Sequence, residues 1–499
     1  MSSLRSTVSR ISTLTRSIFN TASMAFEATA DEAGSNPKGC QTTEDEEAEK
    51  RIAEIERQKK ERARELNCRR VNKCRGKKTA ARLQDERDNA QHSLETSLDE
   101  QQIQLFNDPR RLEFERHLEE SNSEMAAHGK NIFRGLIPRC SGPLKDYTLV
   151  SVEQHLRHIS QAQPHSIMLL VDESWYAARP QLSRSRFLRH LSSTPTRPLS
   201  AQELESSTSN VVTRRLHAEA IVQRFQTSNG RPSRTPLNLL NIPCRTPNLV
   251  PPGIAKYCTL LPEACEAIFS EDNTRLGLEK SINFTLCGQA GFLTHWHMDN
   301  DGFATWVTVE KSHDEEDDGG TLKYWAMVIL DHLSPEHQTT ALAEFAKHGY
   351  RWQPEPSWVR VFSLVPGHTL IMPGGTIHAV VTVTDCLMTG GMYWDKRIFV
   401  SHTLPTWQFI AKNRDLVTNE DPSMQILEVL QWLKTDIRYD PKGYNISPDD
   451  ILGVEGMIQD ILDNSVPCKC QRCGSRCPCR RRGFLCYQDC KLRKCGNRR

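Results

Sequence analysis

The feature that most constrains the fold of this chain is a series of short apolar runs between residues 281 and 395. Apolar and polar residues alternate in these runs, and Gly or Pro separates one run from the next. The runs read SINFTL, ATWVTV, TLKYWAMVIL, WVRVFSLV, HTLIM and HAVVTVT. Repeated short strands with turn residues between them predict a β-sandwich or barrel. One helix is predicted within the series, because Ser334 followed by Pro335 is a typical helix start, and another is predicted around 424–433.

Length and charge set wider limits on the fold. The chain has 499 residues, more than one domain usually holds, so two or more separately ordered regions are expected. Its formal net charge is +2, although strongly charged blocks lie within it. A membrane span needs roughly 18 to 20 consecutive apolar residues, and no stretch of the sequence approaches that. We therefore expect a soluble protein without a membrane partner.

The N-terminal region differs in composition from the rest. The first 26 residues contain no Asp or Glu, are rich in Ser and Thr, and carry three Arg residues. This composition is typical of a mitochondrial presequence, and the alternative is a disordered tail. Residues 44–87 are dense in Glu, Lys and Arg but poor in apolar residues, which predicts a solvated helix or a disordered segment. The basic stretch 59–78 fits a nuclear import signal or a contact to nucleic acid, and equally a solvated helix.

The candidate metal ligands lie in and after the stretch HWHMD. In a β-strand, His295, His297 and Asp299 would share one face because side chains alternate between the two faces. A His-x-Asp triplet alone is weak evidence, so the surroundings decide. Five residues separate Gly291 from His297, and the stretch GHTLIMPGGTIH (367–378) has the order Gly-x5-Pro-x-Gly-x2-His. These are the two halves of the pattern found in cupin-type double-stranded β-helices, whose turns need glycine at positive φ or proline at fixed φ.

Two ligand sets compete within this pattern. In one set, His295 and His297 form a His-x-His pair and Asp301 supplies the acid. In the other, His297 and Asp299 combine with His378, and the spacing from the preceding glycine favours this set. Two histidines and one carboxylate on one face are typical of non-haem Fe(II) oxygenases, in which open coordination positions take co-substrate and O₂. His295 would then be a neighbour of the ligands, and a metal-free fold with buried polar residues is the remaining alternative.

Three stretches together resemble the JmjC domain, particularly the JmjC-like proteins of fungi: GFLTHWHMDNDGFATW, GGTLKYW and PGHTLIMPGGTIHAVVTVTDCLMTGG. The resemblance covers residues 281–395. The positions that match the Fe(II) ligands of the family are His297, Asp299 and His378. The resemblance also implies that Lys323 holds the far carboxylate of the co-substrate 2-oxoglutarate, and that Thr294 forms a hydrogen bond to the same carboxylate. Lys311 lies nearer to the ligands in sequence and is the competing candidate for the lysine.

The resemblance also implies a class of reaction. In that family 2-oxoglutarate is decarboxylated to succinate while O₂ oxidises a C–H bond of a protein. An N-methyl group oxidised in this way leaves as formaldehyde, whereas a side-chain carbon keeps the hydroxyl. The expected activity is therefore that of a histone lysine demethylase or of a protein hydroxylase acting on a chromatin protein. The alternative is a JmjC-like scaffold without working iron. The acidic run 314–318 fits attraction of a histone tail, and equally a solvated loop.

Eight of the seventeen cysteines are crowded into residues 468–499, with the spacing C-x-C-x2-C-x3-C-x-C-x6-C-x3-C-x4-C. So short a segment needs a staple to fold, and thiolates shared by several Zn²⁺ ions would supply it. The predicted zinc ligands are Cys468, Cys470, Cys473, Cys477, Cys479, Cys486, Cys490 and Cys495. The spacing is similar to the CXC domain of tesmin-type chromatin proteins, although Leu492 stands where a further Cys is expected. Eleven Lys and Arg against one acid give a formal charge of +10, which favours contact with DNA phosphates over a structural or protein-docking cap.

These patterns together predict a mixed α+β fold with a cupin-like double-stranded β-helix, or jelly roll, as its catalytic core and helices around it. We expect a disordered or helical charged region over 1–130, a JmjC-type domain over 131–420 with its core at 281–395, a helical linker over 421–466 and a zinc-stapled module over 467–499. The expected activity is that of an Fe(II)- and 2-oxoglutarate-dependent dioxygenase in the nucleus, with the mitochondrion as the alternative location.

Overall fold

The computed structural model of the chain separates into two units, residues 1–88 and 89–499, which are described one at a time. The structure describes residues 57–66, 108–120 and most of 148–465, together with four single residues before position 83. Within the longest part, the positions left out are 162–166, 194–197, 205–210, 229–231, 234, 269–277, 279–280, 313–320, 331–332, 414–415 and 418–423.

In the first unit, residues 57–66 form an α-helix with exposed side chains. Arg57 and Glu54 form a salt bridge of 2.9 Å, and Arg69 and Glu65 form one of 2.8 Å. Exposed pairs about one turn apart contribute little to stability. This helix lies within the stretch for which the sequence predicts a solvated helix or disorder.

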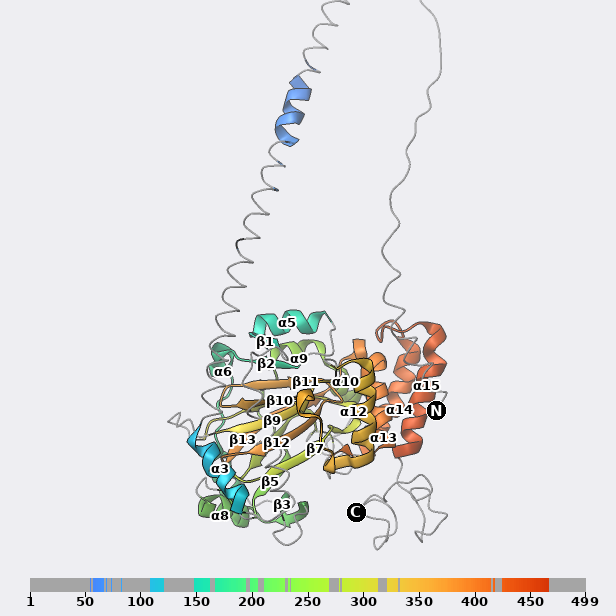
Figure 1. Ribbon diagram of the computed structural model, residues 1–499. Helices are drawn as coiled ribbons and strands as arrows, with labels where there is room; N and C mark the ends of the chain where they lie inside the picture. The colour runs from blue at the N-terminus through green and yellow to red at the C-terminus, as the bar shows by residue number, and fades with distance from the viewer. Residues whose placement is uncertain are drawn as a thin grey trace, which may run out of the picture. The chain divides into compact units, whose positions relative to one another are not determined.

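The second unit is a mixed α and β structure built on two sheets (Figure 1). The larger sheet has nine strands in the order β1-β2-β11-β8-β13-β6-β5-β3-β4, and the smaller has four in the order β10-β9-β12-β7. All described strand pairs are antiparallel except β1 with β2. The strands are β1 (Thr148–Val150), β2 (Met168–Leu170), β3 (Leu199–Leu204), β4 (Val211–Leu216), β5 (Leu237–Pro243), β6 (Phe284–Gly288), β7 (Leu293–His297), β8 (Ala304–Val309), β9 (Lys323–Val328), β10 (Val359–Leu364), β11 (Thr369–Met372), β12 (Ile377–Thr382) and β13 (Cys386–Tyr393). The predicted mixed class is confirmed.

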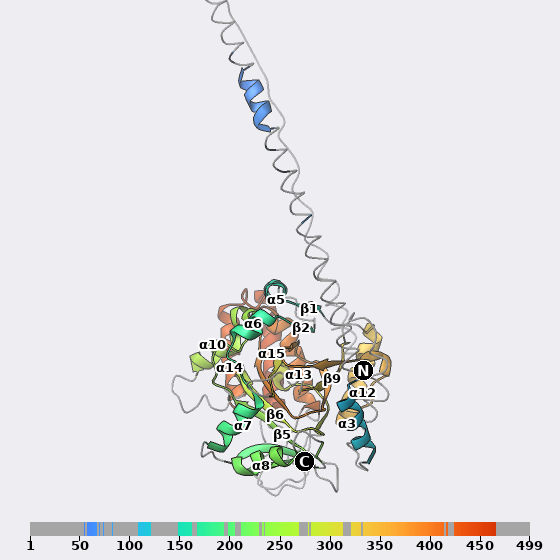
Figure 2. The same cartoon turned by 90° about the vertical axis from the view of Figure 1, so that its left-hand side faces the viewer.

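Helices cover the outer faces of the sheets. The α-helices are α3 (Pro109–Glu120), α5 (Val152–Ser160), α6 (Glu173–Ala178), α7 (Arg184–Ser193), α8 (Ala218–Ser228), α9 (Pro252–Tyr257), α10 (Leu260–Ile268), α12 (Pro335–His348), α13 (Leu404–Lys412), α14 (Met424–Tyr439) and α15 (Ile451–Ser465). Short helical turns are η3 (Asn300–Gly302), η5 (Gly349–Arg351), η6 (Pro356–Trp358), η7 (Lys396–Ile398), the π-helix η8 (Phe399–Thr403) and η10 (Pro448–Asp450). Figure 1 shows α13, α14 and α15 together on one side of the sheets, where their apolar faces share one core. In the turned view of Figure 2 the same helices lie behind the strands.

Alternation along β9 shows how the two sheets enclose an interior. Trp325 and Met327 belong to the core between the sheets, together with side chains of β6, β8, β11 and β13. Tyr324 and Ala326 point the other way and pack with Phe345 of α12. Because side chains of a strand alternate between faces, Lys323 at the start of β9 points into the space between the sheets.

Most of the runs predicted as strands are strands. ATWVTV is β8 from end to end, and HTLIM, WVRVFSLV, TLKYWAMVIL and HAVVTVT contain β11, β10, β9 and β12. The first run is displaced, since β6 begins at Phe284. Helix α12 begins as predicted, with the Ser334 hydroxyl accepting from the His337 amide at 3.3 Å. Helix α14 begins at Met424 and continues to Tyr439, beyond the predicted end.

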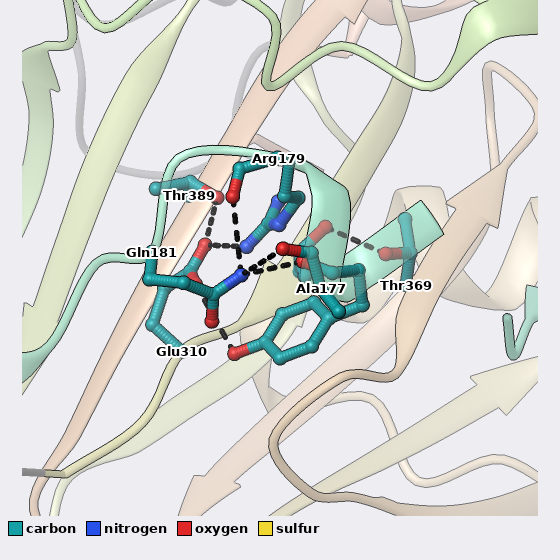
Figure 3. A network of polar contacts seen from close by, with 8 residues as sticks. Ala177, Arg179, Gln181, Glu310, Thr369 and Thr389 are labelled. Atoms are coloured by element: carbon teal, nitrogen blue, oxygen red, sulfur yellow. Dashed lines mark hydrogen bonds and ion pairs between the residues drawn. The ribbon is translucent and has the colours of Figure 1, made fainter. Parts of the chain in front are cut away.

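A buried ion pair holds α6 against the larger sheet (Figure 3). Arg179, which follows α6, donates to the carboxylate of Glu310, which follows β8, and both side chains are at most 1 % exposed. Thr389 of β13 also donates to Glu310. The guanidinium of Arg179 lies over the ring of Tyr176, with 4.7 Å to the ring centroid. This segment before β3 is therefore anchored by charge as well as by apolar packing.

No helix among the described residues is both long enough and apolar enough to cross a membrane. The expected zinc ligands at 468–495, the acidic run 314–318 and the acid-free first 26 residues lie outside the described residues. The predicted linker 421–466 contains α14, η10 and α15.

Candidate metal centre

Two neighbouring strands and one turn bring three side chains together. His297 is the last residue of β7, His378 lies on β12, and the two are register partners across the sheet. Their ring centroids are 4.1 Å apart. Asp299 lies two residues beyond the end of β7, where the chain turns into η3. Its Oδ1 atom is 3.9 Å from the Nε2 atom of His378.

A β-bulge in β7 changes which side chains face the cavity. His378 pairs with His297, but Val380 pairs with Thr294, so three residues of β7 span two of β12. One extra residue in a strand breaks the period of two. As a result Thr294 and His297 both line the cavity, while Trp296 packs in the core beneath α12. The expectation that one uninterrupted strand aligns His295, His297 and Asp299 is therefore wrong.

Hydrogen bonds leave one ligand atom free on each of the three side chains. The Nδ1 atom of His297 bonds to the carbonyl of His295 at 2.7 Å, and the Nδ1 atom of His378 bonds to the carbonyl of Thr376 at 3.0 Å. A ring nitrogen that donates to a carbonyl leaves the other nitrogen, Nε2, with its lone pair. Thr305 donates to Oδ2 of Asp299. Oδ1 of Asp299 is thus the carboxylate oxygen available to an ion.

The three side chains form a largely buried group that can bind a metal ion, since one ligand atom from each lies within 4.8 Å of the others. Metal–ligand bonds to N and O are about 2.0 to 2.2 Å, so small side-chain rotations close the site on an ion. Burial, and then the neighbouring His378, hold the pKa of His297 well below its usual value, which keeps the ring neutral and able to bind a metal. His295 and Asp301 do not belong to this group, which is the one such group in the described part of the chain.

The group opens into a cavity between the two sheets. Lys323, Thr294 and the three candidate ligands all line it. Lys311, the competing lysine, does not line it; its backbone forms an isolated bridge with Ser183. Lys323 is 5 % exposed, whereas the side chain of Asp299 is 18 % exposed. His297 and His378 are 7 % and 2 % exposed, so only Asp299 of the three candidate ligands lies toward solvent, and the lysine is about as deeply buried as the two histidines.

The structure adds a polar cavity residue that the sequence reasoning missed. Asn238 of β5 is 3 % exposed, and its Oδ1 atom has no hydrogen-bond partner in the described structure. This atom and the side chain of Thr382 both lie within 3.5 Å of the position that a Cβ would take on Gly288. Thr382 is the register partner of Lys323, so Asn238 lies at the lysine end. The stretch LNLLNIP gives no motif, and its two Asn residues among apolar ones are the only signal in it.

Turn glycines hold the strands that carry the ligands. Gly291, Gly367 and Gly375 have φ angles of 97°, 91° and 80°. These positive values are unfavourable for residues with a side chain. The prediction that the two halves of the pattern need glycine at positive φ is confirmed.

Compared with protein-family models and with curated protein sequences, the chain matches none. The residues of the cavity therefore provide the evidence for function.

Proposed function

We propose that this chain is an Fe(II)- and 2-oxoglutarate-dependent dioxygenase that oxidises a C–H bond of a chromatin protein. The observation that carries the proposal is the occurrence, in one cavity, of the His297–Asp299–His378 group and the buried cation Lys323. Two histidines and a carboxylate that leave coordination positions open suit Fe(II) and a chelating co-substrate.

The lysine supports a dianionic co-substrate. No described carboxylate forms an ion pair with Lys323, although its side chain is almost fully buried. A buried charge normally has a partner of opposite charge. A carboxylate of the co-substrate would supply that charge.

The strand order supports a jelly-roll core, which is part of the proposal. Strands β6, β8, β11 and β13 lie in the larger sheet, while β7, β9, β10 and β12 form the smaller one. The chain thus passes repeatedly between two facing sheets, as in double-sheet jelly rolls and cupins.

In the proposed reaction the residues of the cavity bind and orient. His297 and His378 would hold Fe(II) through Nε2 and Asp299 through Oδ1. Fe(II) held there would supply coordination positions for chelation by 2-oxoglutarate and for activation of O₂. Lys323 would fix the far carboxylate by an ion pair. The indole of Trp325 lies nearly parallel to the ring of His378, with 5.2 Å between centroids, and shields that ligand from water.

The test is an anaerobic titration of the full chain with Fe(II) and 2-oxoglutarate. The readout is the visible charge-transfer band of the Fe(II)–2-oxoglutarate chelate. We expect a band in the wild type, none in Asp299→Ala, and a weaker apparent affinity for 2-oxoglutarate in Lys323→Ala. Lys311→Ala is the matched control, because that lysine does not line the cavity, and it should titrate like the wild type.

A folded wild-type protein that binds Fe(II) but gives no band would contradict the proposal and favour a scaffold without co-substrate. An equal loss of 2-oxoglutarate affinity in Lys311→Ala and Lys323→Ala would contradict the assignment of Lys323 to the far carboxylate of 2-oxoglutarate.

The cysteine-rich tail extends the proposal to chromatin. Its formal charge of +10 supports binding to DNA phosphates, with zinc as the staple. Such binding weakens steeply with salt, because phosphate contacts release counterions. Retention of DNA affinity after neutralising Arg480, Arg481 and Arg482 would contradict it.

A further inference from the structure

The cavity has two chemically different ends. One end, the lysine end, carries Lys323, Asn238 and Thr294, which are polar. At the other end Met372 of β11 and Met392 of β13 flank Thr305 of β8, because both are its register partners on neighbouring strands. Thr305 itself contacts Asp299. Two thioethers therefore lie beside the candidate metal ligands.

Apart from Asn300, which follows Asp299, most of the remaining lining is apolar. Phe284 and Leu286 of β6, Leu240 of β5 and Val307 of β8 line the cavity along the larger sheet. The ring of Phe284 lies against Gly390: a Cβ at that glycine would be 2.5 Å from its Cε2 atom. Glycine at this position therefore lets the phenyl ring lie across β13 and form part of the wall.

The described lining offers a cation one carboxylate, the amide of Asn300 and two aromatic rings, Trp325 and Phe284, which are at most 4 % exposed. Asp299 is the single carboxylate there, and its two oxygens face Thr305 and His378. Methylammonium groups are typically held over open aromatic faces. One face of Trp325 covers His378, and the ring of Phe284 is packed against the backbone of β13. The other charged side chain of the lining is Lys323, which repels a cation.

We propose that the group presented to the candidate metal centre is an uncharged aliphatic side chain, and that the reaction is its hydroxylation. This inference rests on the proposed function. The overall change is R–H + O₂ + 2-oxoglutarate → R–OH + succinate + CO₂. One oxygen atom enters the C–H bond and the other enters succinate. The four electrons that O₂ accepts come from the C–H bond and from oxidative loss of CO₂, two from each. The hydroxylated carbon of this product is bonded to carbon and not to nitrogen. It therefore cannot expel an amine, and no formaldehyde forms.

The test uses a pair of probes with one shape and different charge. Choline and 3,3-dimethylbutan-1-ol differ only in the central atom of the trimethyl head, which is N⁺ in one and carbon in the other. Their binding to the full chain loaded with Mn(II) is measured by calorimetry, with and without 2-oxoglutarate. We expect the neutral alcohol to bind at least about tenfold more tightly, because burying a cation without a partner is costly. Tighter binding of choline, or no saturable binding of the alcohol, would overturn the inference.

A charge variant makes the same point from the side of the protein. Met392 is partly exposed, so Met392→Glu can place a carboxylate beside the centre without burying it fully. Met392→Gln is the matched control, with similar shape and no charge. Met392→Glu should lower the ratio of alcohol affinity to choline affinity at least about tenfold. Met392→Gln should leave this ratio unchanged. Equal effects of the two variants would contradict the role of charge.

The two proposals fail separately. If 2-oxoglutarate does not bind to the Mn(II)-loaded chain, the proposed function is wrong, although the probes still report the polarity of the site. If 2-oxoglutarate binds and choline is preferred, the dioxygenase proposal stands and the aliphatic substrate class is wrong.

Discussion

Thr305 is the residue that orients Asp299, because its hydroxyl donates to Oδ2 and so leaves Oδ1 for a metal ion. Partners of this kind typically contribute a factor of 10 to 100 in metal affinity. Thr305→Val keeps the shape of the side chain and removes the donor. We expect the affinity for Mn(II), measured by equilibrium dialysis, to fall by about 10- to 100-fold.

The control lies on the same strand. Thr308 is fully buried and shares a 2.6 Å hydrogen bond with Thr369, on the face of β8 that points away from the cavity. Thr308→Val should lower the free energy of unfolding and leave metal affinity unchanged. A similar loss of Mn(II) binding in both variants would mean that Thr305 acts through stability alone.

Asn238 permits a test of the lysine end of the cavity. In Asn238→Asp a carboxylate would lie at the lysine end, where it would form the ion pair that we assign to 2-oxoglutarate and repel that dianion. We expect 2-oxoglutarate affinity to fall by at least about tenfold, with metal affinity retained. Asn238→Leu, which adds no charge, should weaken binding less. If both variants bind 2-oxoglutarate like the wild type, Asn238 does not contact the co-substrate.

At the scale of elements, the Arg179–Glu310 pair fixes α6 to β8. Burial raises the pKa of Glu310 and the facing guanidinium opposes that shift. Glu310→Gln would leave the Arg179 charge buried without its partner. The free energy of unfolding, measured by urea unfolding, should therefore fall by about 3 to 5 kcal/mol. Replacing both residues by Met and Leu should recover most of this loss.

An exposed pair provides the comparison. Arg157 and Glu153 form a salt bridge of 2.9 Å on α5, with side chains 48 % and 74 % exposed. Glu153→Gln should cost less than about 1 kcal/mol. If Glu310→Gln costs no more than that, water reaches the buried pair and the anchor is weaker than its burial indicates.

The elements differ in how far the sequence predicts them. Strands β8 and β11 follow from alternating runs between Gly and Pro, and α12 from its Ser-Pro start, because these signals are local. Strands β1 to β5 were not predicted: β1 and β2 have three residues each, and the ladders of β3 and β5 depend on distant partners. The three candidate ligands were found from turn glycines and spacing. The bulge between Thr294 and His297 was not, because its extra residue is defined only against the register of β12.

At the scale of the whole molecule, buried titratable groups make stability depend on pH in opposing ways. Burial lowers the pKa of His155 and of His368 to about 4, so between that value and about 6.5 only the unfolded chain takes up these protons. Their contribution to stability is therefore complete above pH 6.5 and is lost as the pH falls. Burial raises the pKa of Asp301 to about 7. The folded state takes up that proton first, so acidification favours folding at this residue.

Because these effects partly cancel, a single variant is more informative than the total pH profile. His155 is fully buried, and neither ring nitrogen has a partner in the described structure, so His155→Leu removes a titrating group without breaking a described hydrogen bond. At pH 7 the free energy of unfolding of the variant should lie within about 1 kcal/mol of the wild-type value. At pH 5 it should be more stable than the wild type by about 2 kcal/mol, since a histidine with a pKa of about 4 in the fold and 6.5 in the unfolded chain costs that much there. Urea unfolding of both metal-free proteins at the two pH values measures this difference. An advantage that does not grow between pH 7 and pH 5 would mean that the His155 imidazole takes up its proton in the folded protein, through a solvent path or a partner outside the described residues.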